Sequence, residues 1–359
     1  MSNTSLRLAA LSTAAVPGFA PTTVRMQSAT ADSVSAVLAD DAHRELLIHV
    51  ALTPMEALRG DAERSVLDVF TPAMRNALPF ALPKVVGRTG TGDVGSLRLD
   101  SHGAADPFAG KGKAYVYEPM AGTPIQLSEL TSGPDSLAAS LGRAIAAIHE
   151  LDPATARETG LPDYDAEDYR HRRLAELDQA AETGKVPPRL LQRWEEKLEN
   201  VGLWRFQPCI NHGELSEDRV LARGTAIQSI TGWAQTRIAD PADDLSWLIA
   251  AAEPDAVDTI FEAYAGARAE PPSPQLRERA ELLSELALAG WLLYGVSLDD
   301  DAIIHDGEAM LVDLDEHLFA SAGSDDAHED STDADSRGAG DTDDEPDDPD
   351  DEPDAQSAR

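Results

Sequence analysis

The chain has 359 residues, of which 42% are hydrophobic and 26% are charged, and its formal net charge is −36. These proportions are ordinary for a globular protein, and the strong acidity argues against a nucleic-acid partner because a phosphate backbone requires a positive surface. The single cysteine, Cys209, excludes an internal disulfide framework and indicates a reducing compartment, so we expect a cytoplasmic protein.

The last segment of the chain, residues 321–359, is strongly acidic. It holds 16 Asp and Glu residues against 2 Arg and supplies −14 of the net charge. A segment without large apolar residues buries too little surface to offset the chain entropy of folding, so we predict a disordered tail. Two interpretations of this tail stay open: a solubilising or salt-adapted segment, and a segment that binds a basic protein partner.

The sequence contains no apolar run close to the roughly 20 residues that cross a bilayer, so no membrane partner is expected. The segment 1–20 holds one Arg and a short apolar stretch at 6–10. A secretory signal has a more positive start and a longer apolar core. We therefore interpret this segment as part of the mature protein.

The segment 1–110 predicts short strands around one helix. The strands are expected at residues 22–27, 33–38 and 45–51, and a further strand follows at 114–117 after a loop-rich stretch at 87–113. The helix is expected to begin at Pro54 and to end near Phe70. Its buried face is predicted from helical spacing to contain Leu58, Ala62, Val66 and Val69.

From Gly133 onward the pattern becomes helical. Apolar residues at helical spacing predict a helix over 136–151, with Asp135 as its N-cap. Asp240 as an N-cap and Pro241 at the first helical position predict another helix start. Further helices are expected at 169–183, 188–200, 256–268, 274–294 and 301–318. A small β-rich part therefore precedes a large α-rich part.

Five segments contain the chemically informative residues. The central one, at 211–221, reads Asn-His-Gly-Glu-Leu-Ser-Glu-Asp-Arg-Val-Leu. After it come Ile-Thr-Gly-Trp at 230–233 and Ala-Asp-Pro-Ala-Asp-Asp-Leu at 239–245. Before it come Tyr-Val-Tyr-Glu-Pro-Met-Ala-Gly at 115–122 and Leu-Gly-Arg-Ala-Ile-Ala-Ala-Ile-His at 141–149.

The order and spacing of these segments resemble the aminoglycoside and macrolide phosphotransferases. That family has His-Gly-Asp-Leu at the central segment, Ile-Asp-Trp at the next, and Gly-Asp-Pro-x-x-Asp-Leu at the third. The resemblance covers about residues 22–318. Within the family, the chain is similar to an actinobacterial group described as macrolide phosphotransferase-like. Four residues of one motif are weak evidence, whereas five landmarks in order are fairly specific.

The resemblance implies an α+β, two-lobed protein-kinase-like fold. The small β-rich N-lobe would cover residues 1–117, and the large helical C-lobe would cover 118–320, with a catalytic-loop-like segment at 211–221 and the acidic tail at 321–359. Such proteins transfer the γ-phosphoryl group of ATP or GTP to a hydroxyl of a small molecule. This reaction requires a base near the hydroxyl, Mg²⁺ on oxygen ligands, and a cation near the phosphates.

The chain departs from the family at the positions that carry this chemistry. Glu214 stands at the catalytic aspartate, one methylene longer than the family's residue, and misplacement by about an ångström can cost on the order of 100-fold in rate. Arg219 stands where a metal-binding Asn or His is expected, and a guanidinium has no lone pair for a metal. Gly232, before Trp233, replaces the second metal ligand. We therefore expect no metal site and regard Mg²⁺ as an unsuitable cofactor.

The small lobe lacks its usual phosphate-binding groups as well. No lysine precedes Lys84, and the only glycines before it are Gly18 and Gly60, so neither a strand lysine nor a Gly-rich loop is present. The resemblance places His49 at the lysine position, with Glu63 as its helix partner. Whether this pair forms only a salt bridge or also contacts nucleotide stays open. The hinge-like segment adds Glu118 and Met120 as nucleotide-binding candidates.

Three residues of the large lobe are expected to organise the catalytic loop. The resemblance gives His212 this role, and Asp240 and Asp244 are expected to cap and brace the same loop. For Glu214 the alternatives are a catalytic carboxylate and a cap of nearby backbone amides. For Arg219 they are direct phosphate binding and local pairing with Glu214, Glu217 or Asp218.

Two functions from different classes follow. The first is an ATP-dependent phosphotransferase acting on a small molecule, with activity that is weak or lost in this chain. The second is a catalytically inactive kinase-fold protein that binds a nucleotide, a small molecule or a protein. The retained carboxylate of Glu214 supports the first, and the joint loss of the lysine and both metal positions supports the second.

Overall fold

The computed structural model of the protein describes residues 3–90 and 112–320. The predicted disorder of the acidic tail and most of the loop-rich stretch at 87–113 lie outside these residues. The chain divides into a large unit, Met1–Asp313, and a small one that begins at Leu314. All packing described below lies within the large unit.

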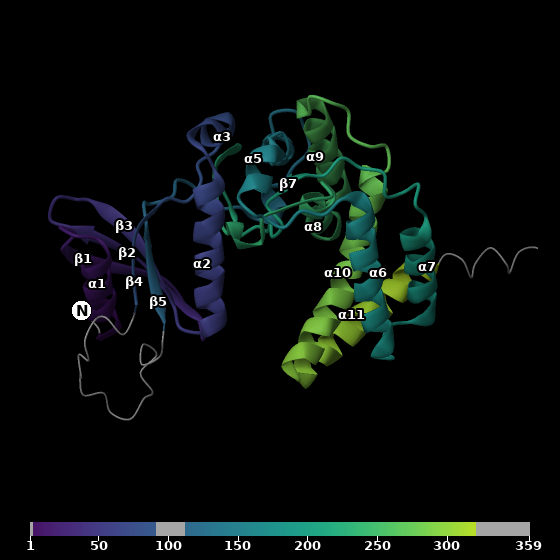
Figure 1. Cartoon of the computed structure of the whole chain (residues 1–359), viewed down its shortest axis with the longest axis horizontal. Helices are drawn as coiled ribbons and strands as arrows, with labels where there is room; N and C mark the ends of the chain where they lie inside the picture. Colours follow the sequence, from purple (N-terminus) through teal and green to yellow (C-terminus); the bar gives the residue numbers. More distant parts are fainter. Residues whose placement is uncertain (1–2, 91–111, 321–359) are drawn as a thin grey trace, which may run out of the picture. The chain divides into compact units, whose positions relative to one another are not determined.

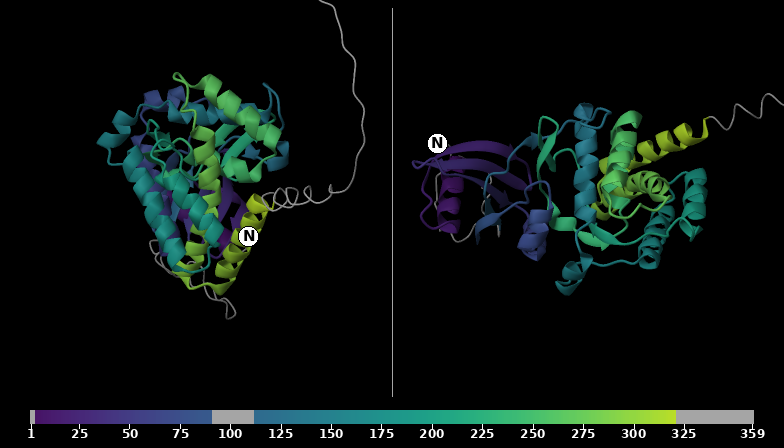
Figure 2. Two further views of the ribbon diagram at one scale, coloured as in Figure 1. Left: turned by 90° about the vertical axis from the view of Figure 1, so that its right-hand side faces the viewer. Right: turned by 90° about the horizontal axis from the view of Figure 1, so that it is seen from above.

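The N-terminal region is built around a β-sheet, as Figures 1 and 2 show. Its elements are α1 (Asn3–Ala15), β1 (Pro21–Ala29), β2 (Ser33–Asp40), β3 (Glu45–Ala51), α2 (Pro54–Val69), α3 (Pro72–Ala77), β4 (Val85–Gly90) and β5 (Lys113–Tyr117). The strands pair antiparallel in the order β1-β2-β3-β5-β4. The three strands predicted from the start of the chain are confirmed.

The C-terminal region is mainly helical, so the predicted α+β class is confirmed. Its helices are α4 (Leu137–His149), α5 (Pro153–Glu158), α6 (Ala166–Glu182), α7 (Pro188–Glu199), α8 (Asp243–Ala251), α9 (Pro254–Ala267), α10 (Leu276–Leu298) and α11 (Asp301–Phe319), with short 3-10 helices η2 (Leu127–Glu129) and η3 (Trp233–Gln235). Its strands are β6 (Thr123–Pro124), β7 (Cys209–Asn211), β8 (Val220–Arg223), β9 (Ala226–Ile230) and β10 (Arg237–Ala239).

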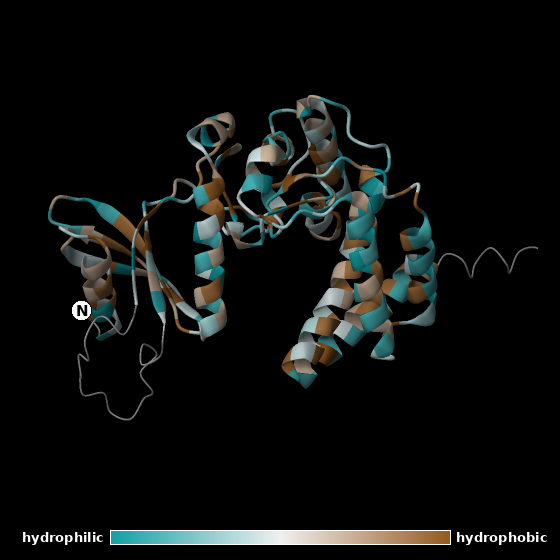
Figure 3. Ribbon diagram, in the orientation of Figure 1, coloured by the Kyte–Doolittle hydropathy of each residue, from teal (hydrophilic) through white to brown (hydrophobic). Residues whose placement is uncertain are grey.

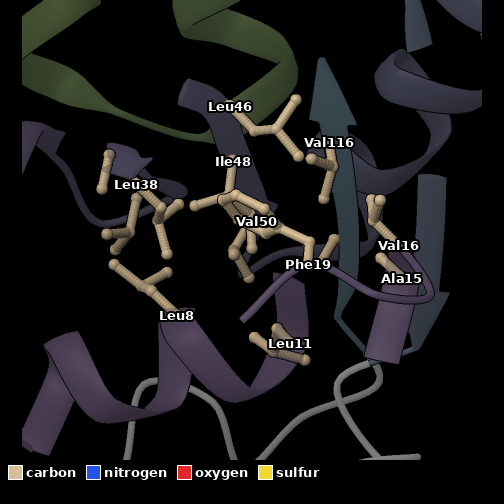
Figure 4. Close-up of a cluster of buried hydrophobic side chains, with 13 residues drawn as sticks. Leu8, Leu11, Ala15, Val16, Phe19, Leu38, Leu46, Ile48, Val50 and Val116 are labelled. Carbon is tan, nitrogen blue, oxygen red and sulfur yellow. The ribbon is translucent and has the colours of Figure 1, made fainter. Parts of the chain in front are cut away.

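The two faces of the N-terminal sheet have different partners because side chains alternate along a strand. One face packs against α1 in a buried apolar cluster that includes Leu8, Leu11, Leu38, Ile48 and Val116 (Figure 4). The opposite face is turned to α2, so α1 and α2 lie on opposite sides of the sheet (Figure 1). Every second residue of β3 and β5 therefore faces α2.

Helix α2 begins as the sequence predicts, and two of the four residues of its predicted face, Val66 and Val69, are buried. The side chain of Thr53 accepts a hydrogen bond from the amide of Glu56, and Pro54 occupies the first turn. The predicted buried residue Leu58 is 64% exposed. A Cβ on Gly60 would lie 2.4 Å from the ring of Tyr115, so the helix approaches the sheet through small residues. The prediction therefore fails in the N-terminal half of the helix, where close packing requires the absence of a side chain, and is confirmed at Val66 and Val69.

The expectation of one helix within the segment 1–110 was also wrong. The described part of this region contains α1, α2 and α3. Only Leu8 and Leu11 among the large apolar residues of α1 are buried, so its apolar spacing is too sparse to stand out. Helix α3 is six residues long, which is shorter than a periodic pattern can reveal.

Two predicted helix starts are displaced. Helix α4 is capped by the side chain of Ser136, which accepts from the amide of Ala139 at 3.1 Å, and not by Asp135. Helix α8 begins at Asp243 and not at Pro241. The carboxylate of Asp240 does accept from the amide of Ala242 at 3.0 Å, but it belongs to a buried ion pair described below.

Helix α10 is, within residues 3–90 and 112–320, the one helix long and apolar enough to cross a membrane by length and composition. Its apolar residues continue to its C-terminal end (Figure 3). Only 33% of its most apolar stretch is buried. It packs against α6, α7 and α8.

Candidate functional site

A cavity of about 200 Å³ lies between the α2 side of the sheet and the loop that follows β9. The sheet, α2, the segment after β5, and the β8 to η3 region all contribute to its walls. The lining includes charged and polar residues, among them His49, Glu56, Arg59, Glu63, Tyr117 and Arg219. Residues far apart in the sequence therefore converge on one space, which we call the sheet-side cavity.

The catalytic-loop-like segment is held from below by a buried carboxylate. Asp244, at the start of α8, accepts hydrogen bonds from the backbone amides of His212 and Gly213, both at 2.7 Å. Its other contact is the ring of His149, whose Nε2 lies 3.2 Å away. Burial acts to raise the pKa of Asp244, but the hydrogen bond and the charge of His149 outweigh it, and the pKa is lowered. An ionised Asp244 thus fixes the loop.

His212 is fully buried and uses both ring nitrogens. Its Nε2 lies 2.9 Å from the carbonyl oxygen of Thr231, and its Nδ1 accepts from the amide of Glu214 at 3.2 Å. The ring also packs edge-on against Trp233. Burial lowers the pKa of His212 to about 4, so the ring is neutral at pH 7. With both nitrogens engaged inside the protein, His212 holds the loop and has no free group for a ligand.

Asp240 lies below the same loop. It is fully buried and forms an ion pair with the equally buried Arg279, with Oδ2 2.6 Å from Nε and Oδ1 3.1 Å from Nη2. Its backbone carbonyl accepts from the side chain of Asn211 at 2.9 Å. The pair therefore connects α10 to the strand that leads into the loop.

Glu214 lies in the catalytic-loop-like segment and forms an ion pair with Arg59 of α2. Its second carboxylate oxygen, Oε2, is buried and has no hydrogen-bond partner among the described residues. A buried acceptor without a partner carries a desolvation cost of about 1–3 kcal/mol. Only one of the two carboxylate oxygens of Glu214 therefore has a partner among the described residues.

The two expected metal-ligand positions are occupied by one side chain. Arg219 lies across Gly232, where a Cβ would be 2.7 Å from its Cδ and Nε atoms. Gly232 has a φ of +82°, a left-handed conformation that favours glycine. An aspartate at this position would require the side chain of Arg219 to shift. Because a guanidinium and a glycine offer no ligand, the residues present do not fit the magnesium ion that the family's chemistry implies.

The predicted partner of His49 was wrong. The Nε2 atom of His49 lies 3.0 Å from Oε1 of Glu56, and its Nδ1 lies 2.9 Å from Oγ of Ser35. The hydrogen bond from His49 lowers the pKa of Glu56. Glu56 and Glu63 are two helical turns apart on the same face of α2, so spacing alone cannot choose between them.

Glu63 instead joins α2 to the loop after β9. Its Oε1 accepts from the amides of Gly232 at 2.9 Å and Trp233 at 3.2 Å. The hydroxyl of Tyr117 donates to its Oε2 at 3.1 Å. Both oxygens are therefore used within the protein, and Glu63 braces the cavity wall.

The two hinge candidates have different positions. Met120 lines the sheet-side cavity, whereas Glu118 is outside its lining. The backbone amide of Glu118 donates to the carbonyl of Lys84 at 3.0 Å, and its carboxylate lies 2.6 Å from the lysine Nζ at the surface. The structure thus brings His49, Glu63, Met120 and Arg219 together and leaves Glu118 apart.

Two charged residues of the sheet-side cavity, Glu56 and Arg59, were missed from the sequence. They lie on α2 at three- and four-residue spacings with Glu63, which places all three on one helix face. That spacing was the available signal. Among the described residues no group of three or more His, Cys, Asp or Glu side chains is arranged to hold a metal ion.

A second cavity, of about 420 Å³, lies within the helical region beside Gly213. Its apolar wall comes from α10 and includes Leu283, Leu286 and Gly290. Its polar wall contains Asp243, which accepts from Arg237 at 2.7 Å and from Arg173 at 3.1 Å. A ligand in this second cavity would contact the apolar wall from α10 and a carboxylate, that of Asp243, which is already paired with two arginines.

The sequence profile of the phosphotransferase enzyme family, APH, matches residues 31–283. The chain belongs to this family. The resemblance expected from the motifs is therefore confirmed. As a phosphotransferase-family protein, the chain has the departures at Arg219 and Gly232 inside the matched region.

Solved structures show the same fold. Macrolide 2'-phosphotransferase MphH from Brachybacterium faecium is 20% identical, with 80% of this chain and 92% of that chain covered and a TM-score of 0.64. Macrolide 2'-phosphotransferase type I is 18% identical, with 87% and 98% covered and a TM-score of 0.66. Aminoglycoside 2'-phosphotransferase-IIIa, solved as a GDP complex, is 15% identical, with 87% and 98% covered and a TM-score of 0.65. At these identities the likeness shows the fold alone.

A curated relative of this phosphotransferase-family protein is the uncharacterized protein YcbJ of Bacillus subtilis (strain 168). It is 22% identical over 111 residues, which is 31% of this chain. The match spans about a third of that relative, 36% of its length.

Proposed function

We propose that this phosphotransferase-family protein binds a small molecule in the sheet-side cavity and does not catalyse magnesium-dependent phosphoryl transfer. The observation that supports this proposal is the placement of Arg219 across Gly232. Arg219 stands at one metal-ligand position and its side chain lies across the other, Gly232, so neither position offers a ligand to a metal ion. The protein would act as a binding module in the cytoplasm.

The expected loss of activity follows from electrostatics. Phosphoryl transfer depends on cations that neutralise charge as it develops on the transferred group. Removing one such stabilising group typically costs about 10²–10³ in rate. This chain lacks the strand lysine as well as both metal positions, so the combined loss is expected to exceed that of one group.

The ion pair between Glu214 and Arg59 adds to the loss. A general base must accept a proton from the acceptor hydroxyl, and it must lie within about 3 Å of it. A carboxylate paired with a guanidinium has to leave its partner before it can do so. The pair therefore favours a resting, inactive arrangement.

The alternative is an ATP- or GTP-dependent phosphotransferase with an altered arrangement of cations. It is favoured by the buried, unpartnered Oε2 of Glu214 at the family's catalytic position. In this alternative Arg219 would replace the metal charge, and the acceptor hydroxyl would come from a small molecule in the second cavity. The solved relatives named for macrolides and aminoglycosides suggest those compounds as acceptors to test.

A phosphoryl-transfer assay decides between the two. The full chain is incubated with ATP or GTP, with and without Mg²⁺, and a panel of macrolides and aminoglycosides. We expect no turnover above that of the Glu214→Ala variant. Asp218→Ala serves as the matched control because Asp218 is an exposed acidic residue of the same loop. Turnover that depends on Mg²⁺, persists in Asp218→Ala and disappears in Glu214→Ala would refute the proposal.

A further inference from the structure

Most charged groups of the sheet-side cavity are already paired within the protein. His49 is bonded to Glu56, and Arg59 forms an ion pair with Glu214. Glu63 is saturated by two backbone amides and the hydroxyl of a tyrosine. These contacts engage the side chains of His49, Glu56, Arg59 and Glu63 within the protein.

Arg219 is different. Its guanidinium takes part in none of the side-chain hydrogen bonds or ion pairs found among residues 3–90 and 112–320, although it lines the cavity and is partly buried. The backbone holds it in place, because the amide of Thr231 donates to its carbonyl oxygen at 2.9 Å. Arg219 therefore presents its guanidinium donors to the cavity.

The position of this cation is informative. Arg219 occupies one of the two expected metal-ligand positions and its side chain covers the other, Gly232. A guanidinium presents N–H donors in a planar fork that matches two oxygens of a phosphate. A phosphate placed here would meet a positive charge without any divalent ion.

The size of the cavity limits the ligand. Sites for drug-sized ligands usually have volumes of about 300–1,000 Å³, and this cavity has about 200 Å³. A single phosphate group on a small organic body is compatible with it.

We propose that this cavity binds a phosphate monoester without a divalent cation and that Arg219 is its phosphate-binding residue. The inference rests on the proposed function, because it assigns a ligand to the site that has lost its metal. The phosphate could belong to a nucleoside monophosphate or to a sugar phosphate, and the experiment separates these sources.

The test is calorimetric titration of the full chain in EDTA with AMP, ribose 5-phosphate, inorganic phosphate and, as an uncharged probe, adenosine. We expect AMP or ribose 5-phosphate to bind in EDTA, adenosine to bind at least tenfold more weakly, and added Mg²⁺ to give no gain. Binding of AMP alone identifies a nucleotide site, and binding of ribose 5-phosphate alone identifies a sugar phosphate site.

The variants identify the residue. Arg219→Gln should weaken binding at least tenfold, whereas Arg223→Gln, an exposed arginine on the neighbouring β8, should leave it unchanged. Arg219→Lys keeps the charge without the fork and should lie between the two, which provides a test if Arg219→Gln does not fold. Equal affinity of wild type and the folded Arg219 variants, no binding of any phosphate, or binding that requires Mg²⁺ would overturn the inference. These outcomes differ from metal-dependent turnover, which refutes the proposed function itself.

Discussion

The buried ring of His212 should make the stability of this protein depend on pH. The ring is fully buried, and burial lowers its pKa to about 4. In the unfolded chain the same group titrates near 6.5. The folded pKa is the lower one, so between these values the unfolded state binds more protons and stability rises with pH. The contribution is complete above about pH 6.5 and is lost as pH falls toward 4.

The magnitude follows from linkage. One pKa unit corresponds to about 1.36 kcal/mol, and a shift from 6.5 to about 4 gives a loss of about 2 kcal/mol between pH 6.5 and pH 4.5. Asp244 beneath the loop also has a lowered pKa, and its stabilisation is lost only at lower pH, below its ordinary value of 3.8. The two effects therefore fall in different pH windows.

Urea unfolding at pH 7.5, 6.5, 5.5 and 4.5 measures this effect. His212→Asn should be less stable than wild type at pH 7.5 and should lose about 2 kcal/mol less than wild type between pH 6.5 and 4.5. His305→Asn, at an exposed histidine of α11, should behave like wild type. If His212→Asn loses as much stability over this range as wild type does, the assignment to His212 is wrong.

Three further predictions concern stability at pH 7. Arg279→Met leaves the carboxylate of Asp240 buried and unpaired and should cost about 3–5 kcal/mol in urea unfolding; a loss below about 1 kcal/mol would contradict this. Gly290→Ala should stabilise the protein by about 0.5–1 kcal/mol, because its Cβ would meet no atom within 4 Å on a helix. Gly142→Ala should destabilise it, because a Cβ there would lie 2.3 Å from the carbonyl of Ile260; thermal unfolding that ranks the two in the opposite order would refute the packing argument.

Arg219 and Gly232, which replace the two metal ligands expected from the family, are linked by a direct contact. The two residues are in contact, because a Cβ at 232 would lie 2.7 Å from the Cδ and Nε atoms of Arg219 and its side chain would have to shift, and each residue replaces one of the two metal ligands. The glycine in turn has a positive φ that favours this residue type. A single reversion of either residue is therefore not expected to restore a metal site.

Local patterns determined much of this protein. Alternating apolar residues predicted the strands at 33–38 and 45–51, and five motifs in order predicted the family. These features depend on neighbours in sequence, so they are visible without a structure. The missing lysine, the longer carboxylate at Glu214 and the replacement at Arg219 were visible in the same way.

The contacts between distant segments were decided only by tertiary structure. Glu56 and Glu63 project from the same face of α2, and the register between helix and sheet selects Glu56 for His49. Arg59 of α2 meets Glu214, which lies in a loop far along the chain. Such pairs depend on how far a helix slides and turns against its neighbours, a degree of freedom that residue order along the chain does not encode locally.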